Sequence, residues 1–442
     1  MHFTTRFQWG FLLTTIVSVI ACTNNDIDPN ATAGTVSKGD ADFTKYVAVG
    51  NSLTSGYADG GLYRDGQLNS YPNILAGQFK SVGGGDFIQP LFTTEQANGT
   101  GYIRLKKLPA SATSLPTFDT TKTQLAVRSL SSTGGVLYTK FTGTNQNLGV
   151  PGIRIADVLR VGYGSKEGNP YFERFLDDQA AATTYLQYIS TNLAGATFFS
   201  CWLGNNDALG YATSGGVGAE NETRGLTSVS LFTTNFTAVM SKLTENNRKG
   251  VVIGIPNVVQ TPFFTTATAQ IKTLLQAQGI PGLAIQSKSA PGGVKISGDG
   301  DYFLLSIAPV LTSFITRGVG LSAANPIPDQ YVLDASEVQT LTSRINSFNG
   351  IMKAQADAKG VAYVDPNSAL NQISSATGLV QSGITYTGSY LQGGVYSLDG
   401  IHLTPAGYAL MANEIIKGIN AKYNATVPQV NPANYRRVLL QN

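Results

Sequence analysis

Residues 46–57 read YVAVGNSLTSGY, and this stretch decides the fold class. The apolar run Tyr46 to Val49 is typical of a fully buried strand, and the Gly-Asn-Ser that follows leads directly into a helix-compatible segment. In open α/β sheets, ligands bind where the parallel strands end. The stretch therefore predicts a strand that delivers Ser52 to a ligand-binding edge. The alternative is that Ser52 merely caps the next helix.

The same alternation of a short apolar run and a helix-compatible stretch recurs along the chain. The further strand candidates are residues 197–203, 251–255 and 361–364, and the clearest helix candidates are 183–193, 231–246, 334–358 and 405–423. Thr404 suits the N-cap of the last helix, since Pro405 then takes the first helical position. This order predicts an α/β fold, a three-layer α/β/α sandwich with a mostly parallel sheet.

Two segments interrupt the alternation. Residues 81–145 and 257–330 are rich in Gly, Thr, Ser and Pro and hold only strand-like fragments such as 101–104 and 136–141. We interpret both as insertions into one α/β domain, forming β-rich or irregular walls above the sheet. The predicted domain covers residues 45–425, and residues 426–442 form a C-terminal tail. A second independent domain is the less favoured alternative.

The N-terminus has the features of an export signal. Arg6 precedes an apolar run, residues 11–21, that is too short for a membrane-spanning helix, which needs about 20 residues. Because the run ends in Val-Ile-Ala-Cys, which resembles a bacterial lipobox, we predict a signal peptide at 1–21 and lipidation of Cys22. Residues 22–44 then form a flexible tether. The alternative is an ordinary signal peptide with an incidental Cys22.

From this leader we expect an exported protein that is lipid-anchored to a bacterial membrane, with the outer membrane favoured and the side it faces left open. The chain carries 30 basic and 27 acidic side chains, so its net charge of +3 indicates neither nucleic acid nor an acidic surface as a partner. The mature chain would keep one free cysteine, Cys201, and one histidine, His402. Such a set cannot form an intramolecular disulfide or the usual zinc site, and we predict no metal and no cofactor. Cys201 lies in an apolar run and is predicted to be a buried structural thiol.

Histidine chemistry is confined to one motif, SLDGIHLTPAGY at residues 397–408. Asp399 precedes His402 by three positions. An aspartate bonded to the Nδ1–H of an imidazole fixes the tautomer that leaves Nε2 free to take a serine proton. The pair is therefore the candidate orienting carboxylate and general base for Ser52, whereas the alternative is an ordinary surface loop.

Two further segments offer hydrogen-bond donors for a developing oxyanion. Asn206 lies in Gly204-Asn-Asn-Asp207, directly after the strand candidate 197–203, and Gly152 lies at a loop-to-helix turn within residues 147–157. The backbone N–H of Ser52 would point into the same crevice. Asn and Gly also favour turns for local reasons, so each segment has an alternative explanation as ordinary turn chemistry.

Taken together, these four segments resemble in this order the SGNH hydrolase family, also called GDSL esterases and lipases. The resemblance covers the chain from about residue 46 to residue 423. It implies a flavodoxin-like sheet and a catalytic triad of Ser52, Asp399 and His402. It also implies an oxyanion hole made by the backbone N–H groups of Ser52 and Gly152 and the side-chain amide of Asn206.

One position departs from the family pattern, since Asn51 stands where the family has an aspartate. That aspartate is not a member of the triad, so the exchange bears on the local loop more than on the chemistry, and an asparagine still accepts and donates hydrogen bonds. The motif also lacks a second glycine two residues after the serine. This absence argues against the nucleophile elbow of α/β-hydrolases.

The sequence therefore predicts a serine esterase that hydrolyses carboxylic esters through an acyl-enzyme. The substrate stays open between an O-acylated carbohydrate and a lipid ester, because an aromatic cleft that includes Tyr57, Tyr63 and Tyr71 would suit a sugar face or an acyl chain. Core packing is the alternative for most of these aromatic residues. Two rival functions are an O-acyltransferase acting on glycans and a non-catalytic surface lipoprotein that binds a glycan or another partner.

Overall fold

A computed structural model gives the structure of residues 35–108 and 116–438. The predicted signal peptide at 1–21, the predicted lipidation site Cys22 and the predicted tether as far as residue 34 lie outside the described residues. The chain from Val36 onward belongs to one compact unit. Within the two described ranges, no helix has both the length and the apolar character needed to cross a bilayer.

A parallel four-stranded sheet forms the centre of this unit. Its strands, in spatial order, are β1 (Tyr46–Gly50), β6 (Phe198–Trp202), β7 (Lys249–Ile253) and β12 (Ala362–Val364). Every residue of β1 and β6 is buried, because helices cover both faces of the sheet. The hydroxyl of Ser200 in β6 is paired inside the core with that of Tyr46 at 2.6 Å. These strands occupy the four positions predicted from the sequence.

Residues 146–150 extend the sheet beyond β1. The N–H of Ala48 donates to the carbonyl of Gln146, and the N–H of Leu148 donates back to the carbonyl of Ala48. One step further, the N–H of Val150 donates to the carbonyl of Gly50. Counting this edge segment as the second element in the chain, the order is 2-1-3-4-5, which is that of flavodoxin-like sheets. The predicted fold class is confirmed.

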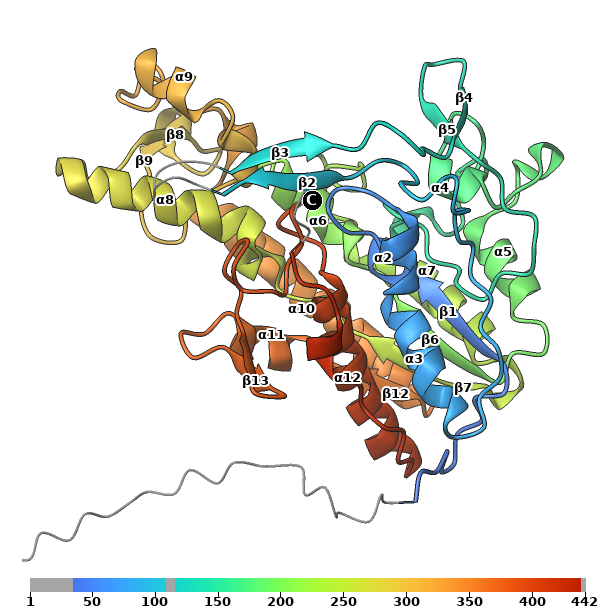
Figure 1. Ribbon diagram of the computed structural model, residues 1–442. Coiled ribbons are helices and arrows are strands. Elements are labelled where there is room, and N and C mark those ends of the chain that lie inside the picture. Colours follow the sequence, from blue (N-terminus) through green and yellow to red (C-terminus); the bar gives the residue numbers. More distant parts are fainter. Residues whose placement is uncertain (1–34, 109–115, 439–442) are drawn as a thin grey trace, which may run out of the picture. The chain divides into compact units, whose positions relative to one another are not determined.

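Helices cover both faces of the sheet (Figure 1). One face carries α3 (Tyr71–Lys80) and α12 (Pro405–Tyr423), and the other carries α5 (Tyr185–Asn192), α7 (Val229–Leu243) and α10 (Ala335–Ala358). Alternate residues of β1 join the two resulting cores: Tyr46 and Ala48 pack toward α3 and α12, whereas Val47 and Val49 pack toward the other layer.

Two local predictions are also confirmed. Thr404 caps α12, since its Oγ1 accepts a hydrogen bond from the N–H of Gly407 at 3.0 Å and Pro405 takes the first helical position. Cys201 is fully buried in the core beneath α5, α7 and α10. Burial raises the pKa of this thiol to about 12, so the reactive thiolate is absent near neutral pH.

Several short helices, the longer helix α8 and antiparallel pairs of short strands complete the fold. The remaining helices are α1 (Ser52–Ser55), α2 (Arg64–Leu68), α4 (Pro170–Glu173), α6 (Asn206–Thr213), α8 (Pro262–Gln278), α9 (Leu311–Thr316) and α11 (Asn367–Ile373). Antiparallel hairpins pair β2 (Ile103–Lys107) with β3 (Thr117–Thr120), β4 (Val127–Leu130) with β5 (Val136–Tyr138), β8 (Ala284–Gln286) with β9 (Val294–Ile296), and β13 (Leu379–Gln381) with β14 (Ile384–Tyr386). Strands β10 (Tyr302–Phe303) and β11 (Val332–Leu333) also pair antiparallel, but the segment between them contains α9.

The segment 257–330 differs from the prediction. It contains the 17-residue helix α8, so the expectation of a β-rich or irregular wall was wrong there. Pro262 takes the first helical position, and Gly279 ends the helix with a positive φ of 65°. The four threonines of α8 made the segment look unfavourable for a helix. Inside the helix a threonine can bond back one turn, as Thr268 does by donating to the carbonyl of Phe264 at 2.6 Å.

Candidate active site

Ser52, His402 and Asp399 lie within hydrogen-bonding distance of one another. Ser52 is the first residue of α1, directly beyond β1, and the other two lie in the loop that precedes α12. Nε2 of His402 is 2.9 Å from Oγ of Ser52, and its Nδ1 is 2.8 Å from Oδ2 of Asp399. The structure thus brings the three predicted side chains into one continuous line of hydrogen bonds.

Asn51 holds the turn that presents Ser52. Its Oδ1 accepts a hydrogen bond from the N–H of Leu53 at 3.0 Å, which caps α1. Its Nδ2 donates to Oδ1 of Asn205 at 2.8 Å, which ties the turn to the end of β6. An ionised aspartate could fill the first role but has no hydrogen for the second. The exchange at this position therefore preserves the loop through a different hydrogen bond.

The carboxylate of Asp399 is held by several hydrogen bonds. Oδ1 accepts from the N–H groups of Ile401 and His402 at 2.9 and 2.8 Å and from the hydroxyl of Ser397 at 3.2 Å. Oδ2 accepts from the N–H of Gly60 at 3.0 Å in addition to His402. Burial alone would raise the pKa of Asp399, but the neighbouring imidazole and these hydrogen bonds outweigh it and hold the pKa well below its usual range.

The register of the sheet brings the segments that carry Gly152 and Asn206 to the level of Ser52. Gly50 pairs with Trp202 across the β1–β6 ladder and also accepts from Val150 on the other side. Two residues beyond these three positions come Ser52, Gly204 and Gly152. Because parallel strands end at a common edge, the three loops leave the sheet side by side.

The donors themselves are free to bind a ligand atom. Within residues 35–108 and 116–438, the backbone N–H groups of Ser52 and Gly152 have no acceptor. Gly152 is exposed, with a positive φ of 83°. Asn206, the first residue of α6, donates one Nδ2 hydrogen to the carbonyl of Ile153 at 2.9 Å, which leaves the second hydrogen available.

Asp207 joins the loop of Asn206 to the loop of Gly152. Its fully buried carboxylate accepts from the N–H groups of Ile155 and Ala156 at 2.7 and 3.1 Å and from the hydroxyl of Thr227 at 2.7 Å. Burial raises its pKa to about 6. The sequence motif contained this residue, but no role for it was predicted, because its partners lie far away in the chain.

A family model described as GDSL-like lipase/acylhydrolase matches residues 46–415. The chain belongs to this family. The protein is accordingly a carboxylic ester hydrolase. No curated protein matches the chain.

Solved structures similar to this hydrolase include a catalytic mutant of an acetylxylan esterase from Geobacillus stearothermophilus, with 9% identity, a TM-score of 0.34 and coverage of 86% of this chain and 95% of the other. An extracellular lipase from Streptomyces rimosus shows 14% identity and a TM-score of 0.29, covering 87% of this chain and 100% of the other. Phospholipase A1 from Streptomyces albidoflavus shows 12% identity and a TM-score of 0.28, covering 87% and 99%.

Of the three tyrosines that follow Ser52, one contacts the candidate site of this GDSL-like hydrolase. The ring of Tyr57 lies 4.6 Å from that of His402, centroid to centroid, and its hydroxyl donates to the carbonyl of Gly60 at 2.7 Å. Burial, with the nearby Asp399, raises the pKa of Tyr57 to about 12. Tyr63 and Tyr71 are buried in the protein interior, as the packing alternative predicted.

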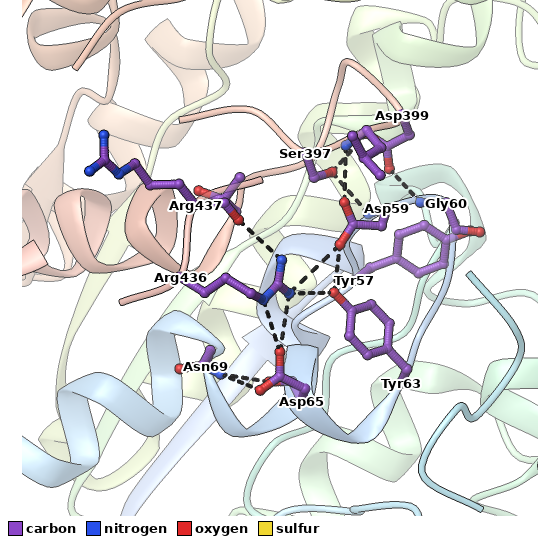
Figure 2. Close-up of polar contacts among 12 residues, drawn as sticks. Tyr57, Asp59, Gly60, Tyr63, Asp65, Asn69, Ser397, Asp399, Arg436 and Arg437 are labelled. Atoms are coloured by element: carbon purple, nitrogen blue, oxygen red, sulfur yellow. Dashed lines mark hydrogen bonds and ion pairs between the residues drawn. The ribbon is translucent and has the colours of Figure 1, made fainter. Parts of the chain in front are cut away.

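A second buried carboxylate, that of Asp59, lies next to the loop of Asp399 (Figure 2). The N–H of Asp59 donates to Oγ of Ser397 at 2.9 Å, and its Oδ1 accepts from the N–H of Leu398 at 3.0 Å. The adjacent Gly60 bonds to Asp399 directly, as described above. Residues 59–60 therefore fix the backbone and the side chains of the loop that carries the candidate triad carboxylate.

Asp59 is in turn fixed by the C-terminal segment. The hydroxyl of Tyr63 donates to its Oδ2 at 2.6 Å, and the guanidinium of Arg436 lies 3.8 Å from the same oxygen. Arg436 also donates to the hydroxyl of Tyr63 at 2.8 Å and to Oδ2 of Asp65 at 3.1 Å (Figure 2). Burial raises the pKa of Asp59. The hydrogen bonds from Tyr63 and Leu398 and the charge of Arg436 act in the opposite direction but do not outweigh the effect of burial.

Neither Asp59 nor Arg436 was predicted from the sequence to be part of the site. Asp59 lies seven residues after Ser52 and had no partner in a recognised motif, and Arg436 lies in the segment predicted to be a tail. Within the described part of the chain, no three His, Cys, Asp or Glu side chains lie close enough to hold a metal ion. The site as described consists of protein groups suited to proton transfer and to binding an oxyanion.

Proposed function

We propose that this hydrolase cleaves its ester through a triad of Ser52, His402 and Asp399 and through an acyl-enzyme. The observation that carries the proposal is the line of hydrogen bonds from Ser52 Oγ to His402 Nε2 at 2.9 Å and from His402 Nδ1 to Asp399 Oδ2 at 2.8 Å. A nucleophile within reach of a base that is itself oriented by a carboxylate is the arrangement that acyl transfer requires.

In the first half of the reaction, Nε2 of His402 takes the proton of Ser52 as Oγ attacks the ester carbonyl. The tetrahedral intermediate collapses, the bond to the alcohol oxygen breaks, and the departing alcohol takes the proton from His402. In the second half a water molecule gives its proton to His402 and attacks the acyl-enzyme. Collapse then releases the carboxylic acid and returns the proton to Ser52.

The negative charge that develops on the carbonyl oxygen has three donors in this proposal: the N–H groups of Ser52 and Gly152 and the free Nδ2 hydrogen of Asn206. Preorganised donors of this kind stabilise the transition state more than the substrate. Asp399, whose pKa is held low, remains ionised and stabilises the imidazolium that forms on His402 in each half-reaction.

The proposal is tested by ester hydrolysis and by labelling with a fluorophosphonate. Ser52→Ala should abolish labelling and lower kcat by about 10⁶-fold, as for other broken nucleophile–base units. The matched control is Ser55→Ala in the same helix, whose hydroxyl donates to the carbonyl of Ser52 at 2.9 Å. We expect the control to be labelled and to lose less than about tenfold in kcat. Full labelling of a folded Ser52→Ala variant would refute the triad.

O-acyl transfer to a glycan would use the same residues but would exclude water from the acyl-enzyme. Product analysis with and without a sugar acceptor separates the two reactions, since a hydrolase releases free acid in both cases. The fluorophosphonate experiment also excludes a purely binding function for the protein, because a non-catalytic scaffold has no activated serine to label.

We also propose that the hydrolase is an exported lipoprotein anchored through Cys22. The lipobox-like Val-Ile-Ala-Cys sequence after the short apolar run supports this proposal. In bacteria fed an alkyne-tagged fatty acid, the wild-type protein should carry the tag and fractionate with membranes. Cys22→Ala should lose both properties, and retention of the tag in this variant would contradict the proposal.

A further inference from the structure

A cavity of about 620 Å³ lies beside the loop that carries Asp399 and His402. Its walls come from three separate parts of the chain, namely Leu108 and residues 116–118 at the β2–β3 hairpin, residues between 263 and 309 from α8 to just beyond the 3₁₀ helix η6 (Leu305–Ile307), and the loop 390–399. Its apolar lining residues include Phe118, Phe263, Leu305, Pro309 and Leu398, together with the ring of Tyr390. Both predicted insertions therefore supply a wall of this cavity.

The cavity is in direct contact with the candidate triad loop. The N–H of Phe263 donates to the carbonyl of Gly400 at 3.0 Å. A Cβ at Gly400 would lie 3.2 Å from Cδ2 of Leu305, so no gap separates this wall from the loop. Asp399 itself lines the cavity, and only the imidazole ring of His402 stands between its carboxylate and Ser52 Oγ.

The lining is chemically suited to hydrocarbon. Asp399 is the only charged residue among the 15 described residues that line the cavity, and its oxygens already accept five hydrogen bonds. A sugar placed there would find neutral polar partners in Thr266, Gln270, Ser306 and Gln392, but most of the lining surface is apolar, and each hydroxyl buried without a partner costs free energy. An alkyl chain gains from the same burial. The volume also lies within the usual range for small-molecule sites.

We infer that this cavity binds a long alkyl chain of the ester, so that the substrates are lipid-like esters rather than acetylated carbohydrates. The inference rests on the proposed function, because it takes Ser52 as the nucleophile. The alkyl chain belongs either to the acyl group or to the alcohol group of the ester. Both have the same hydrocarbon chemistry, and two substrate series distinguish them.

The first series consists of p-nitrophenyl esters with acyl groups from acetate to dodecanoate, and the second of acetate esters of linear alcohols from ethanol to dodecanol. In one of the two, kcat/KM should rise about fourfold for each methylene that enters the cavity, which is the conversion of ~0.8 kcal/mol per buried methylene. A rise in the first series places the acyl chain in the cavity, and a rise in the second places the alcohol there. A flat or falling profile in both overturns the inference.

A matched pair of variants tests whether the preference for long chains arises in this cavity. Ala308 lines the apolar cavity, whereas Ala269 lines the neighbouring depression, whose wall is rich in serine and threonine. Ala308→Trp should lower the ratio of kcat/KM for the preferred long-chain ester over its shortest homologue at least tenfold. Ala269→Trp should leave this ratio within twofold of wild type. Equal chain-length profiles for a folded Ala308→Trp and the wild type would contradict the assignment.

A second variant keeps the test decisive if Ala308→Trp does not fold. Phe118 lies in the β2–β3 hairpin and is 38% exposed, so Phe118→Ser removes apolar wall without opening the protein core. It should lower the same ratio severalfold, and an unchanged ratio would count against the inference.

Failure of this inference is distinguishable from failure of the proposed function. If Ser52-dependent hydrolysis of short acetate esters is observed without any preference for long chains, the cavity assignment is wrong and the triad stands. If no ester in either series is hydrolysed in a Ser52-dependent manner, the proposed function itself is wrong.

Discussion

Asp59 and Asp399 are joined through a single hydroxyl, that of Ser397. Oγ of Ser397 accepts from the N–H of Asp59 at 2.9 Å and donates to Oδ1 of Asp399 at 3.2 Å (Figure 2). The N–H of Leu398 donates to Oδ1 of Asp59 and thereby fixes the loop a second time. The candidate triad carboxylate is thus oriented by residues that follow α1, in addition to its own loop.

Asp59 is therefore a positioning residue, and Asp59→Asn should lower kcat while changing KM little. The amide would turn a donor toward Tyr63 or Leu398, which are both donors to this side chain, and the loop of Asp399 would shift. A loss of about 10²-fold in kcat is expected for a small misplacement of this kind. Steady-state kinetics with a short ester separate kcat from KM.

The matched control for this variant is Asp65→Asn. Asp65 bonds to the same guanidinium of Arg436 but is exposed and has no contact with the loop of Asp399. Its substitution should change kcat less than twofold. If the two variants lost activity equally, the effect would come from Arg436 and not from the link through Ser397.

Asn206→Ala should lower kcat by about 10²–10³, equivalent to ~2.7–4 kcal/mol, because one of the three proposed oxyanion donors is lost. Asn206→Asp is a sharper test, since it keeps the size of the side chain and removes the donor. The expected ranking in kcat is wild type, then both Asn206 variants, then Ser52→Ala. If a folded Asn206→Ala were as inactive as Ser52→Ala, the assigned role would be incorrect.

Asn51→Asp should fold and keep kcat within about tenfold of wild type, because the amide of Asn205 can turn and donate to the new carboxylate. Asn51→Leu should have a much lower free energy of unfolding than Asn51→Asp. It removes the cap of α1, at a cost of about 1 kcal/mol, and leaves the side chain of buried Asn205 unpaired, at a further cost of about 1–3 kcal/mol. Urea unfolding of the three proteins measures the difference, and equal stabilities of the two variants would contradict this account.

Glu337→Gln should stabilise the protein above neutral pH. Glu337 forms a capping box with Asp334 at the start of α10, and burial raises its pKa to about 7 from an ordinary value near 4.5. The folded state then holds a proton that the unfolded state releases, so stability falls as pH rises from about 4.5 to about 7. A neutral glutamine keeps the hydrogen bond from the N–H of Asp334 without this loss.

The difference between the Tm of Glu337→Gln and that of wild type should therefore become more positive from pH 4.5 to pH 7.5, as measured by scanning calorimetry. Glu245→Gln is the control, since Glu245 is exposed and pairs with Lys242 on the surface. Its Tm difference from wild type should not show the same increase over this range. A pH-independent difference for Glu337→Gln would refute the assigned proton uptake.

The parts of the fold that follow from local patterns were predictable. A continuous apolar run predicts strand β1, and the Thr404-Pro405 start predicts helix α12. The motifs that contain Ser52 and the Asp399–His402 pair are short enough to be recognised in a single sequence. Helix α8 was missed because threonine disfavours helices in isolation, while tertiary packing decides here: Phe264 and Ile271 are buried. Asp59 and Arg436 were missed because their partnership spans almost the whole chain and has no local signal.

The side chains of the candidate triad come from distant parts of the chain. Ser52 lies near the beginning of the described residues, whereas Asp399, His402 and Arg436 all lie after residue 398. A fragment that stops before residue 399 would therefore contain Ser52 without the imidazole and the carboxylate that are proposed to activate it. Such a fragment should hydrolyse no ester, even if its central sheet were intact.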